Sequence, residues 1–342
     1  MKILQLLAGG EAGGAELFFT RLVCALYEKN IDQLLVVRRH HARNSIFRGK
    51  NIPFHEIHYG NLFDIYSRYR LKNIAKRYGP DIVMSWMNRA SFFSPKGPWV
   101  NVGRLGGYYN LKYYKNCQYL VCNTMDIRNY VIAHGWPEHK VRYIPNFVDE
   151  VKSPAFGRSE VNTPLNVPLI VSVGRLHHNK AIDTLIAAMA EVERAYLWIV
   201  GKGPEEKKLI KMVADLKLQN RVRFLGWRDN VSSIYAAADI FVCPSRHEPL
   251  GNVVLEAWVQ EIPVIATMSQ GPGELISDEV NGLLVPVDDP AAMAEAIKKI
   301  IIDKSLACRL VTEGRKIYAG RFSREIIVND YLQFFSELKS AK

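Results

Sequence analysis

The sequence predicts an α/β protein made of two doubly wound domains in series, and three observations support this. Short β-rich runs alternate with helical stretches along the 342-residue chain, which is typical of βα units around a parallel sheet. The alternation is interrupted once, at residues 149–168, where Pro, Ser, Asn and Gly are frequent. At roughly 150 residues per domain, the length allows two domains that each bury a core.

The first series of elements begins at the N-terminus, and a helix is expected near 15–29. Its expected strands are 2–7, 33–37, 82–86, 100–103, 119–123 and 141–144. The strands expected in the second series are 169–173, 196–200, 222–225, 240–242, 264–266 and 282–285. We therefore predict domains at 1–150 and 169–322, a linker at 151–168, and a C-terminal segment 323–342 that is helical to 338.

Composition excludes several classes of protein. Hydrophobic residues make up 48% and charged residues 23%, as in soluble globular proteins. The apolar runs are far shorter than the ~18–20 residues of a membrane-spanning helix. The first strand is too short for a signal peptide, so we expect a cytoplasmic protein. Five scattered cysteines without a C-x-x-C pair indicate reduced thiols rather than disulfides or a zinc site.

The net charge of +11 is unevenly distributed. Residues 1–150 carry 21 Lys and Arg against 11 Asp and Glu, which gives +10, whereas residues 151–342 carry 24 against 23. The first half is therefore expected to face an anionic partner. Its densest basic stretch is a predicted amphipathic helix that contains Arg68, Arg70, Lys72, Lys76 and Arg77.

Three interpretations of this basic stretch are open. The charges can form a solvated helix face, or they can contact an anionic membrane surface, where aromatic rings and lysine stems also bury well. A nucleic-acid partner is disfavoured, because no helix-turn-helix, zinc-finger or RNA-binding motif accompanies the charge.

Glycines follow the first expected strand, in the segment 9–16. Gly13 and Gly14 open the first helix, and glycines at such a turn let the backbone approach a ligand while the helix N-terminus favours an anion. The dinucleotide fingerprint is not matched, and no acidic residue follows the second strand, so an NAD enzyme is disfavoured. A tight turn without a ligand is the alternative.

The second domain has two more turns of this kind. Gly174-Arg175-Leu176 ends its first strand, and Lys180 follows just before a helix. A forked guanidinium and a point-charge ammonium at such a place suit a diphosphate. Gly201-Lys202-Gly203-Pro204 ends the next strand. Each turn taken alone fits an ordinary βα connection equally well.

The most specific segment is 244–257, with the sequence PSRHEPLGNVVLEA. Glu248 lies in a loop, and Glu256 lies about one and a half turns into the helix that starts near Gly251. Between them the first-turn amides of Asn252, Val253 and Val254 are expected to be free. Helix amides can hold phosphate oxygens while carboxylates bind hydroxyl groups, which suits a nucleotide sugar. The alternative is a helix with two surface glutamates.

Together these motifs resemble the retaining glycosyltransferases of family 4, and particularly enzymes of the bacterial lipopolysaccharide-core type. The resemblance covers nearly the whole chain and is strongest from 169 to 286. It implies the GT-B fold, in which two Rossmann-like domains face each other across a cleft and the final helix, here in 323–342, packs back on the first domain. It also implies a nucleotide-sugar donor in the second domain, with UDP as the default and GDP or ADP open. The first domain would hold a glycan or lipid-linked acceptor, in the cytoplasm or on the inner face of the cytoplasmic membrane.

The resemblance also implies roles for particular residues. The expected catalytic residues are Arg175, Lys180 and Glu248. Arg175 and Lys180 would bind the donor diphosphate and stabilise the leaving nucleotide, so that no metal or other cofactor is required, and Glu248 would contact the donor sugar. Glu256 would bind the ribose, and the base would lie along the turn at 225–228. The residues expected to bind the donor are Gly13, Gly14, Gly174, Gly201, Arg228, Gly251, Asn252, Val253 and Glu256.

One position departs from the family pattern. Many relatives have His or Asp after the strand at 100–103, whereas this chain has Arg104, which we expect to face the donor phosphate or the acceptor. Two other functions are open. An epimerase or hydrolase of the same fold would consume the donor without an acceptor, and a non-catalytic protein would bind the donor without turnover.

Overall fold

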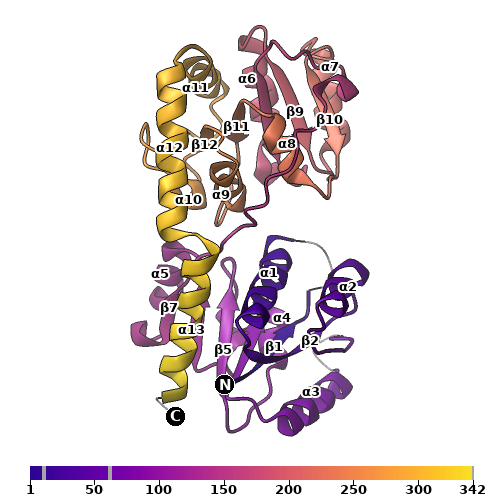
Figure 1. The fold of residues 1–342 in the computed structure, drawn as a ribbon, viewed down its shortest axis with the longest axis vertical. Helices are drawn as coiled ribbons and strands as arrows, with labels where there is room; N and C mark the ends of the chain where they lie inside the picture. The colour runs from indigo at the N-terminus through magenta and orange to yellow at the C-terminus, as the bar shows by residue number, and fades with distance from the viewer. Residues whose placement is uncertain (10–12, 61–63, 341–342) are drawn as a thin grey trace. The chain divides into compact units, whose positions relative to one another are not determined.

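The computed structural model describes residues 1–9, 13–60 and 64–340 and contains two compact units (Figure 1). The first unit comprises Met1–Phe147 and Ser323–Lys342, and the second comprises Val148–Phe322. Each unit is built on one parallel sheet with helices on both faces. The predicted fold class, α/β with two doubly wound sheets, is confirmed.

The first sheet has the order β3-β2-β1-β4-β5-β6-β7, and all neighbouring strands are parallel. The chain reverses its direction of winding between β1 and β4, so loops on either side of this point diverge. The strands are β1 (Lys2–Leu7), β2 (Asp32–Val37), β3 (Phe54–Glu56), β4 (Ile82–Trp86), β5 (Val100–Leu105), β6 (Tyr119–Cys122) and β7 (Val141–Tyr143).

Two apolar layers cover this sheet. One contains residues of α1 (Gly14–Glu28), α2 (His41–Gly49) and α13 (Arg324–Ser340), and the other contains residues of α3 (Ile65–Tyr78) and α4 (Met87–Phe93). The unit also contains α5 (Met125–Ala133) and two short 3₁₀ turns, η1 (Leu111–Tyr114) and η2 (Glu138–Lys140). Because both faces are covered, the central strands are buried along their whole length, as β4 shows.

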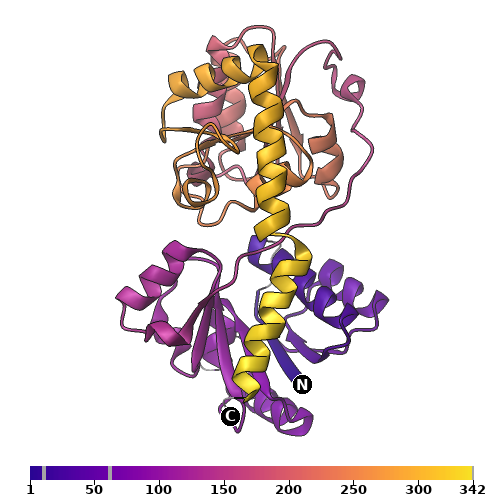
Figure 2. The same cartoon turned by 60° about the vertical axis from the view of Figure 1, so that its left-hand side comes forward.

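The last helix, α13, packs on the first unit, as both views show (Figures 1 and 2). Its buried face joins the core of that unit through Ile327, Val328, Tyr331, Phe334, Phe335 and Leu338. Ion pairs flank this apolar face: Arg142 meets Glu337 at 3.2 Å, and Arg324 meets Glu28. The helix is therefore an integral part of the first unit's core.

Arg104 on β5 lies in the core of the first unit, whereas we expected it to face the donor phosphate or the acceptor. Its side chain is 1% exposed, and its Nε donates to the Tyr331 hydroxyl at 3.1 Å. A second nitrogen donates to Asn146 Oδ1. The guanidinium lies 4.6 Å from the ring centroids of Phe18 and Trp86. Arg104 therefore joins β5 to α13 inside the core, as a buried cation satisfied by hydrogen bonds and aromatic rings.

Replacing Arg104 by alanine is expected to destabilise the protein by about 3 kcal/mol, because it leaves a cavity and removes the donor from which the Tyr331 hydroxyl and Asn146 Oδ1 accept. The matched control is Arg142→Ala, which also removes an arginine that contacts α13. Its ion pair is half exposed, so the expected cost is below about 1 kcal/mol. Urea denaturation of both variants measures the difference; equal midpoints would contradict the structural role of Arg104.

The second sheet has the order β10-β9-β8-β11-β12-β13, again entirely parallel. Its winding reverses between β8 and β11. The strands are β8 (Leu169–Val173), β9 (Tyr196–Val200), β10 (Val222–Gly226), β11 (Ile240–Cys243), β12 (Val264–Thr267) and β13 (Leu283–Val285). The helices are α6 (Ile182–Glu191), α7 (Glu206–Asp215), α8 (Val231–Ala237), α9 (Asn252–Val259), α10 (Gln270–Leu275), α11 (Pro290–Ile302) and α12 (Lys304–Arg321).

The segment 151–168, expected as a linker, packs on the second unit. The ring of Phe156 meets Trp198 edge to face at 5.7 Å. Arg158, in the 3₁₀ turn η3 (Arg158–Val161), donates to the carbonyl of Ala237 at 2.6 Å and pairs with Asp239. This segment is therefore part of the second unit's structure.

Candidate active site

The candidate site lies at the carboxyl edge of the second sheet, where its winding reverses. In open α/β sheets this switch point is the usual place for a ligand. The turn after β8 carries Arg175 and Lys180, and the loop after β11 carries Glu248. Since β8 and β11 are parallel neighbours in the sheet, the two turns start from adjacent strand ends.

Lys180 and Glu248 form an ion pair across this point. Lys180 lies in the 3₁₀ turn η4 (His178–Lys180), and its Nζ donates to Glu248 Oε2. Their side chains are only 25% and 12% exposed. Burial alone would lower the pKa of Lys180, but the negative charge of Glu248 outweighs burial and raises the pKa above its ordinary 10.5. Lys180 is therefore cationic at any physiological pH.

Arg175 provides a second cation at this edge. Its side chain is exposed, and it forms no hydrogen bond or ion pair with any part of the chain that the structure describes. Ser245, in the same loop as Glu248, donates to Glu248 Oε2 at 3.5 Å. The structure therefore brings all three predicted catalytic residues to one unit and one sheet edge, with Arg175 available to an incoming anion.

Close backbone contacts join the turns after β8 and β9 at this edge of the sheet. Gly201, after β9, has φ +136°, and a Cβ there would lie 1.9 Å from the carbonyl oxygen of Gly174. A Cβ on Gly203 would lie 2.2 Å from the carbonyl oxygen of Leu176. The turns after β8 and β9 thus touch through their backbones, which only glycine allows.

The helix α9 starts at the same edge. Gly251 precedes it with φ +81°, a conformation that favours glycine. Asn252 and Val253 occupy its first turn, as predicted. The amide of Val254 donates to the carbonyl of Gly251 at 2.9 Å, so the expectation that this amide is free is wrong. The N-terminus of α9 still places the positive end of the helix dipole at this edge of the sheet.

The residues predicted to bind the ribose and the base, Glu256 and Arg228, lie on α9 and in the loop after β10. Glu256 lies on α9 and accepts from the hydroxyl of Tyr235 at 3.4 Å. Arg228 follows β10, donates to the carbonyl of Leu225 at 3.1 Å and lies 5.2 Å from the ring of Phe156. Beside it the ring of Trp227 is 60% exposed, which offers a flat surface for stacking.

Sequence analysis missed the role of Arg246. Its guanidinium makes two bonds of 2.9–3.0 Å to the carboxylate of Asp183 and pairs with Asp288 at 2.6 Å. It also donates to the carbonyl of His178 at 2.8 Å. Arg246 therefore holds the turn that carries Lys180 against the loop that carries Glu248. The position of Arg246 in the motif 244–257 does not predict this positioning role, because its partners Asp183 and Asp288 are distant in sequence.

Arg246→Ala is expected to lower kcat/KM for the reaction of this site at least about tenfold, since small displacements of reacting groups are costly. Burial alone would raise the pKa of Asp183, but hydrogen bonding to Arg246 outweighs it and lowers the pKa below 3.8. The ion pair therefore contributes its full stabilisation at pH values above the ordinary carboxyl pKa of 3.8. This stabilisation is lost as the pH falls through the lowered pKa of Asp183. Arg246→Lys, which cannot form the two-pronged bond, should restore only part of the activity. Full activity in Arg246→Ala would contradict a positioning role.

Gly13 and Gly14 lie in the first unit, at the start of α1 after β1. A Cβ on Gly13 would lie 2.7 Å from Glu16 Oε2, and one on Gly9 would lie 2.2 Å from Glu16 Oε1. The carboxylate of Glu16 therefore lies against the glycine backbone at this turn. Residues 10–12 of the predicted glycine-rich segment lie outside the described residues.

The predicted basic helix exists as α3. Lys72, Lys76 and Arg77 are exposed on it, while Arg68 lies over the ring of Phe92 at 4.4 Å and Arg70 over the ring of Tyr66 at 5.7 Å. The exposed apolar side chains of this helix are Ile65, Tyr66 and Tyr69. Its surface therefore combines positive charge with aromatic and aliphatic groups.

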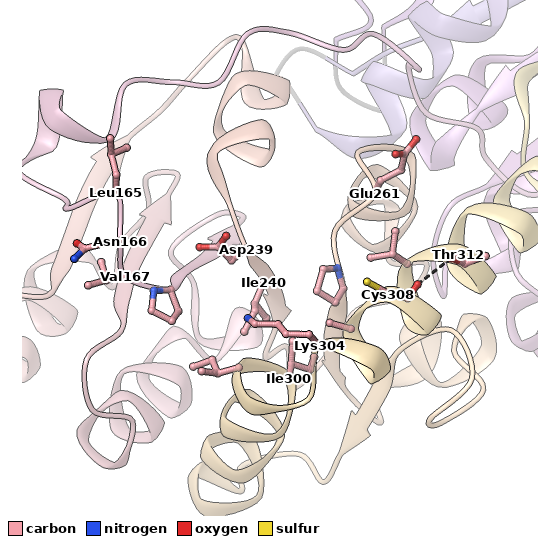
Figure 3. Close-up of a pocket in the computed structure, with 15 residues that line it drawn as sticks. Leu165, Asn166, Val167, Asp239, Ile240, Glu261, Ile300, Lys304, Cys308 and Thr312 are labelled. Carbon is pink, nitrogen blue, oxygen red and sulfur yellow. Dashed lines mark hydrogen bonds between the residues drawn. The ribbon is translucent and has the colours of Figure 1, made fainter.

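A pocket of the second unit is separate from the candidate site. It has a volume of about 590 Å³ and is lined by residues that precede strands, including Pro168, Asp239 and Pro263 (Figure 3). It therefore lies at the amino edge of the second sheet, opposite Lys180 and Glu248. Within residues 1–9, 13–60 and 64–340, no group of three His, Cys, Asp or Glu side chains could hold a metal ion. In the same residues no helix is long and apolar enough to cross a bilayer.

Two family profiles match the chain. Glycosyltransferase Family 4 matches residues 12–152, and Glycosyl transferases group 1 matches residues 156–317. Together they cover nearly all of both units.

The chain is also similar to relatives over nearly its full length, and its fold is similar to that of solved structures. The chain is 40% identical to the lipopolysaccharide core biosynthesis glycosyltransferase LpsE of Rhizobium meliloti, over 96% of this chain and 97% of LpsE. It is 36% identical to LpsD of the same organism, over 98% of each chain. Anabaena Alr3699/HepE, whose crystal structure was solved with UDP-glucose, superposes with a TM-score of 0.86 at 22% identity, over 98% of this chain and 100% of HepE.

Proposed function

The chain belongs to the glycosyltransferases of family 4 and has the GT-B fold, and from this premise we propose that it transfers a sugar from a nucleotide sugar to a glycan or lipid-linked acceptor. The observation that carries the proposal is the cluster of Arg175, Lys180 and Glu248 at the switch point of the second sheet. Two cations and one carboxylate at this place suit a diphosphate joined to a sugar.

We propose a role for each part of the site. Arg175 and Lys180 bind the donor diphosphate, and the backbone turns at Gly174 and Gly201 let it lie close to the sheet edge. Glu248 accepts hydrogen bonds from hydroxyl groups of the sugar and keeps Lys180 in place through their ion pair. Glu256 binds the ribose, and the base lies beside Arg228.

We propose that the reaction retains the configuration of the anomeric carbon. The acceptor oxygen attacks that carbon from the side on which the nucleotide leaves, and the bond between the carbon and the diphosphate oxygen breaks. The acceptor proton passes to the departing diphosphate. The protein contributes positions and positive charge, because Arg175 and Lys180 stabilise the charge that develops on the leaving group. An NMR spectrum of the product that shows an inverted anomeric bond would contradict retention.

A thermal-shift screen tests donor binding without an acceptor. A ligand that binds only the folded state raises the melting temperature. We expect a shift with UDP-sugars in the presence of EDTA, since Arg175 and Lys180 replace the charge of a metal ion. The double variant Arg175→Ala/Lys180→Ala should lose this shift. GDP-, ADP- and dTDP-sugars serve as comparisons, and a shift only after Mg²⁺ is added would contradict metal independence.

We propose the lipopolysaccharide core as the acceptor class, on the nearly full-length similarity to LpsE and LpsD. Such acceptors are anionic and are held at a membrane. The charge of +10 on residues 1–150 and the exposed Ile65, Tyr66 and Tyr69 of α3 favour peripheral contact with the inner face of the cytoplasmic membrane. Sedimentation with anionic vesicles tests this contact, and failure to sediment at low salt would contradict it.

A further inference from the structure

A pocket of about 470 Å³ lies between α3 and the edge of the first sheet. Its polar lining comes from Arg70, Asn73 and Arg77 of α3 and from His55 of β3, and Leu34 and Ile74 line its apolar part. Arg70, Asn73 and Arg77 follow one another at spacings of three and four residues, which places them on one face of the helix. The pocket is formed by the first unit alone.

The two arginines of this pocket are not neutralised by the protein. Neither Arg70 nor Arg77 forms a hydrogen bond or an ion pair with any described residue. The carboxylates of the neighbouring strands have other partners: Asp32 accepts from the hydroxyl of Tyr78 at 2.7 Å, and Glu56 binds Asn44 and Arg48. The side chains that line the pocket, Tyr78 included, therefore carry two arginine charges and no carboxylate.

The geometry of the lining suits a compact anion with several oxygens. Guanidinium groups bind phosphate through paired N–H donors, and the amide of Asn73 and the ring of His55 add further donors. The ring of Tyr66 lies 5.7 Å from the guanidinium of Arg70 and helps to orient it. One phosphate group with two negative charges would balance the two arginines.

We propose that this pocket, at the outer edge of the first sheet, is a second anion site that binds a phosphate group through Arg70 and Arg77. It is separate from the candidate donor site, which lies in the other unit. The phosphate can belong to a lipid headgroup or to a soluble phosphate. The exposed Ile65, Tyr66 and Tyr69 near the pocket favour the headgroup, because such side chains bury at a membrane interface.

The test uses the full chain and two double variants with the same change in charge. Arg70→Gln/Arg77→Gln removes the pocket cations, whereas Lys72→Gln/Lys76→Gln removes two exposed cations from the same helix outside the pocket. Binding is measured to phosphatidylcholine vesicles that contain phosphatidic acid, to vesicles of equal charge that contain oleate, and to inorganic phosphate by calorimetry. Stabilisation by UDP, measured in parallel, reports whether each variant folds and keeps the donor site.

We expect the affinity for phosphatidic-acid vesicles to fall at least about tenfold further in Arg70→Gln/Arg77→Gln than in Lys72→Gln/Lys76→Gln, which loses only the non-specific attraction of two cations to the anionic surface. If Arg70→Gln/Arg77→Gln loses affinity for inorganic phosphate in parallel, the ligand is a soluble phosphate. If this variant loses affinity for vesicles alone, the ligand is the lipid headgroup. Equal losses in the two double variants, equal binding to oleate vesicles, or no loss in either variant would overturn the proposal. An unchanged effect of UDP separates these outcomes from a failure of the proposed transfer reaction.

Discussion

Lys180→Ala is expected to lower kcat/KM for sugar transfer by about 10²–10³-fold, the usual cost of removing one group that stabilises developing negative charge. Lys180 is suited to this role because Glu248 holds its ammonium group at the sheet edge and raises its pKa. A raised pKa keeps the lysine charged, so its contribution is complete below pH 10.5 and is lost only as the pH rises through the folded value. Activity changes between pH 6 and 9 should therefore be the same in the wild type and in Lys180→Arg.

The control for this variant is Lys208→Ala. Lys208 lies on α7 in the same unit, is largely exposed and pairs with Glu205 at 3.2 Å. Its removal makes the same change in net charge and should leave kcat/KM within about twofold of the wild type. If both variants lose activity equally, the loss is caused by net charge and the role of Lys180 is contradicted.

Gly201→Ala is expected to destabilise the protein by about 3 kcal/mol and to abolish donor binding. The backbone at this position has φ +136°, and the new Cβ would lie 1.9 Å from the carbonyl oxygen of Gly174. The backbone strain of a non-glycine residue at this φ alone costs on the order of 1–3 kcal/mol. Relief of the contact requires the turns after β8 and β9 to move apart, which displaces Arg175 from the proposed donor site.

Gly320→Ala is the matched control in the same unit. Gly320 lies in α12, and a Cβ there has no atom within 4 Å. Since alanine favours helices more than glycine does, this variant should be as stable as the wild type or more stable by up to about 1 kcal/mol. Urea denaturation measures both variants. A Gly201→Ala protein with the midpoint of the wild type would show that the turns are not in contact.

The fold could be predicted where strands are fully buried. In a parallel sheet covered on both faces such strands are mostly apolar on both faces, so the sequence predicts β8 and β9 with the bounds that the structure has. The strand β3 was missed because its three residues at the sheet edge include exposed His55 and carry no such pattern. Local patterns therefore identify central strands better than edge strands.

The candidate site could be predicted where neighbours in the sheet carry it. Loops at the carboxyl ends of β8 and β11 must approach one another, so a contact between Lys180 and Glu248 follows from the topology. The roles of Arg104 and Arg246 could not be predicted, because each depends on partners far away in sequence. Tyr331 meets Arg104 only after α13 has folded onto the first sheet, and Asp288 meets Arg246 only after α11 has packed on the second.

The central claim is that the carboxyl edge of the second sheet binds a nucleotide sugar and transfers its sugar to an acceptor. The most direct test incubates the purified protein with UDP-sugars and a truncated lipopolysaccharide core in EDTA, and follows the acceptor by mass spectrometry. We predict an increase in mass by one sugar residue that requires both substrates, is retained in Lys208→Ala and is lost in Lys180→Ala. Consumption of the donor at the same rate without any acceptor would contradict the claim and would identify a hydrolase or epimerase instead.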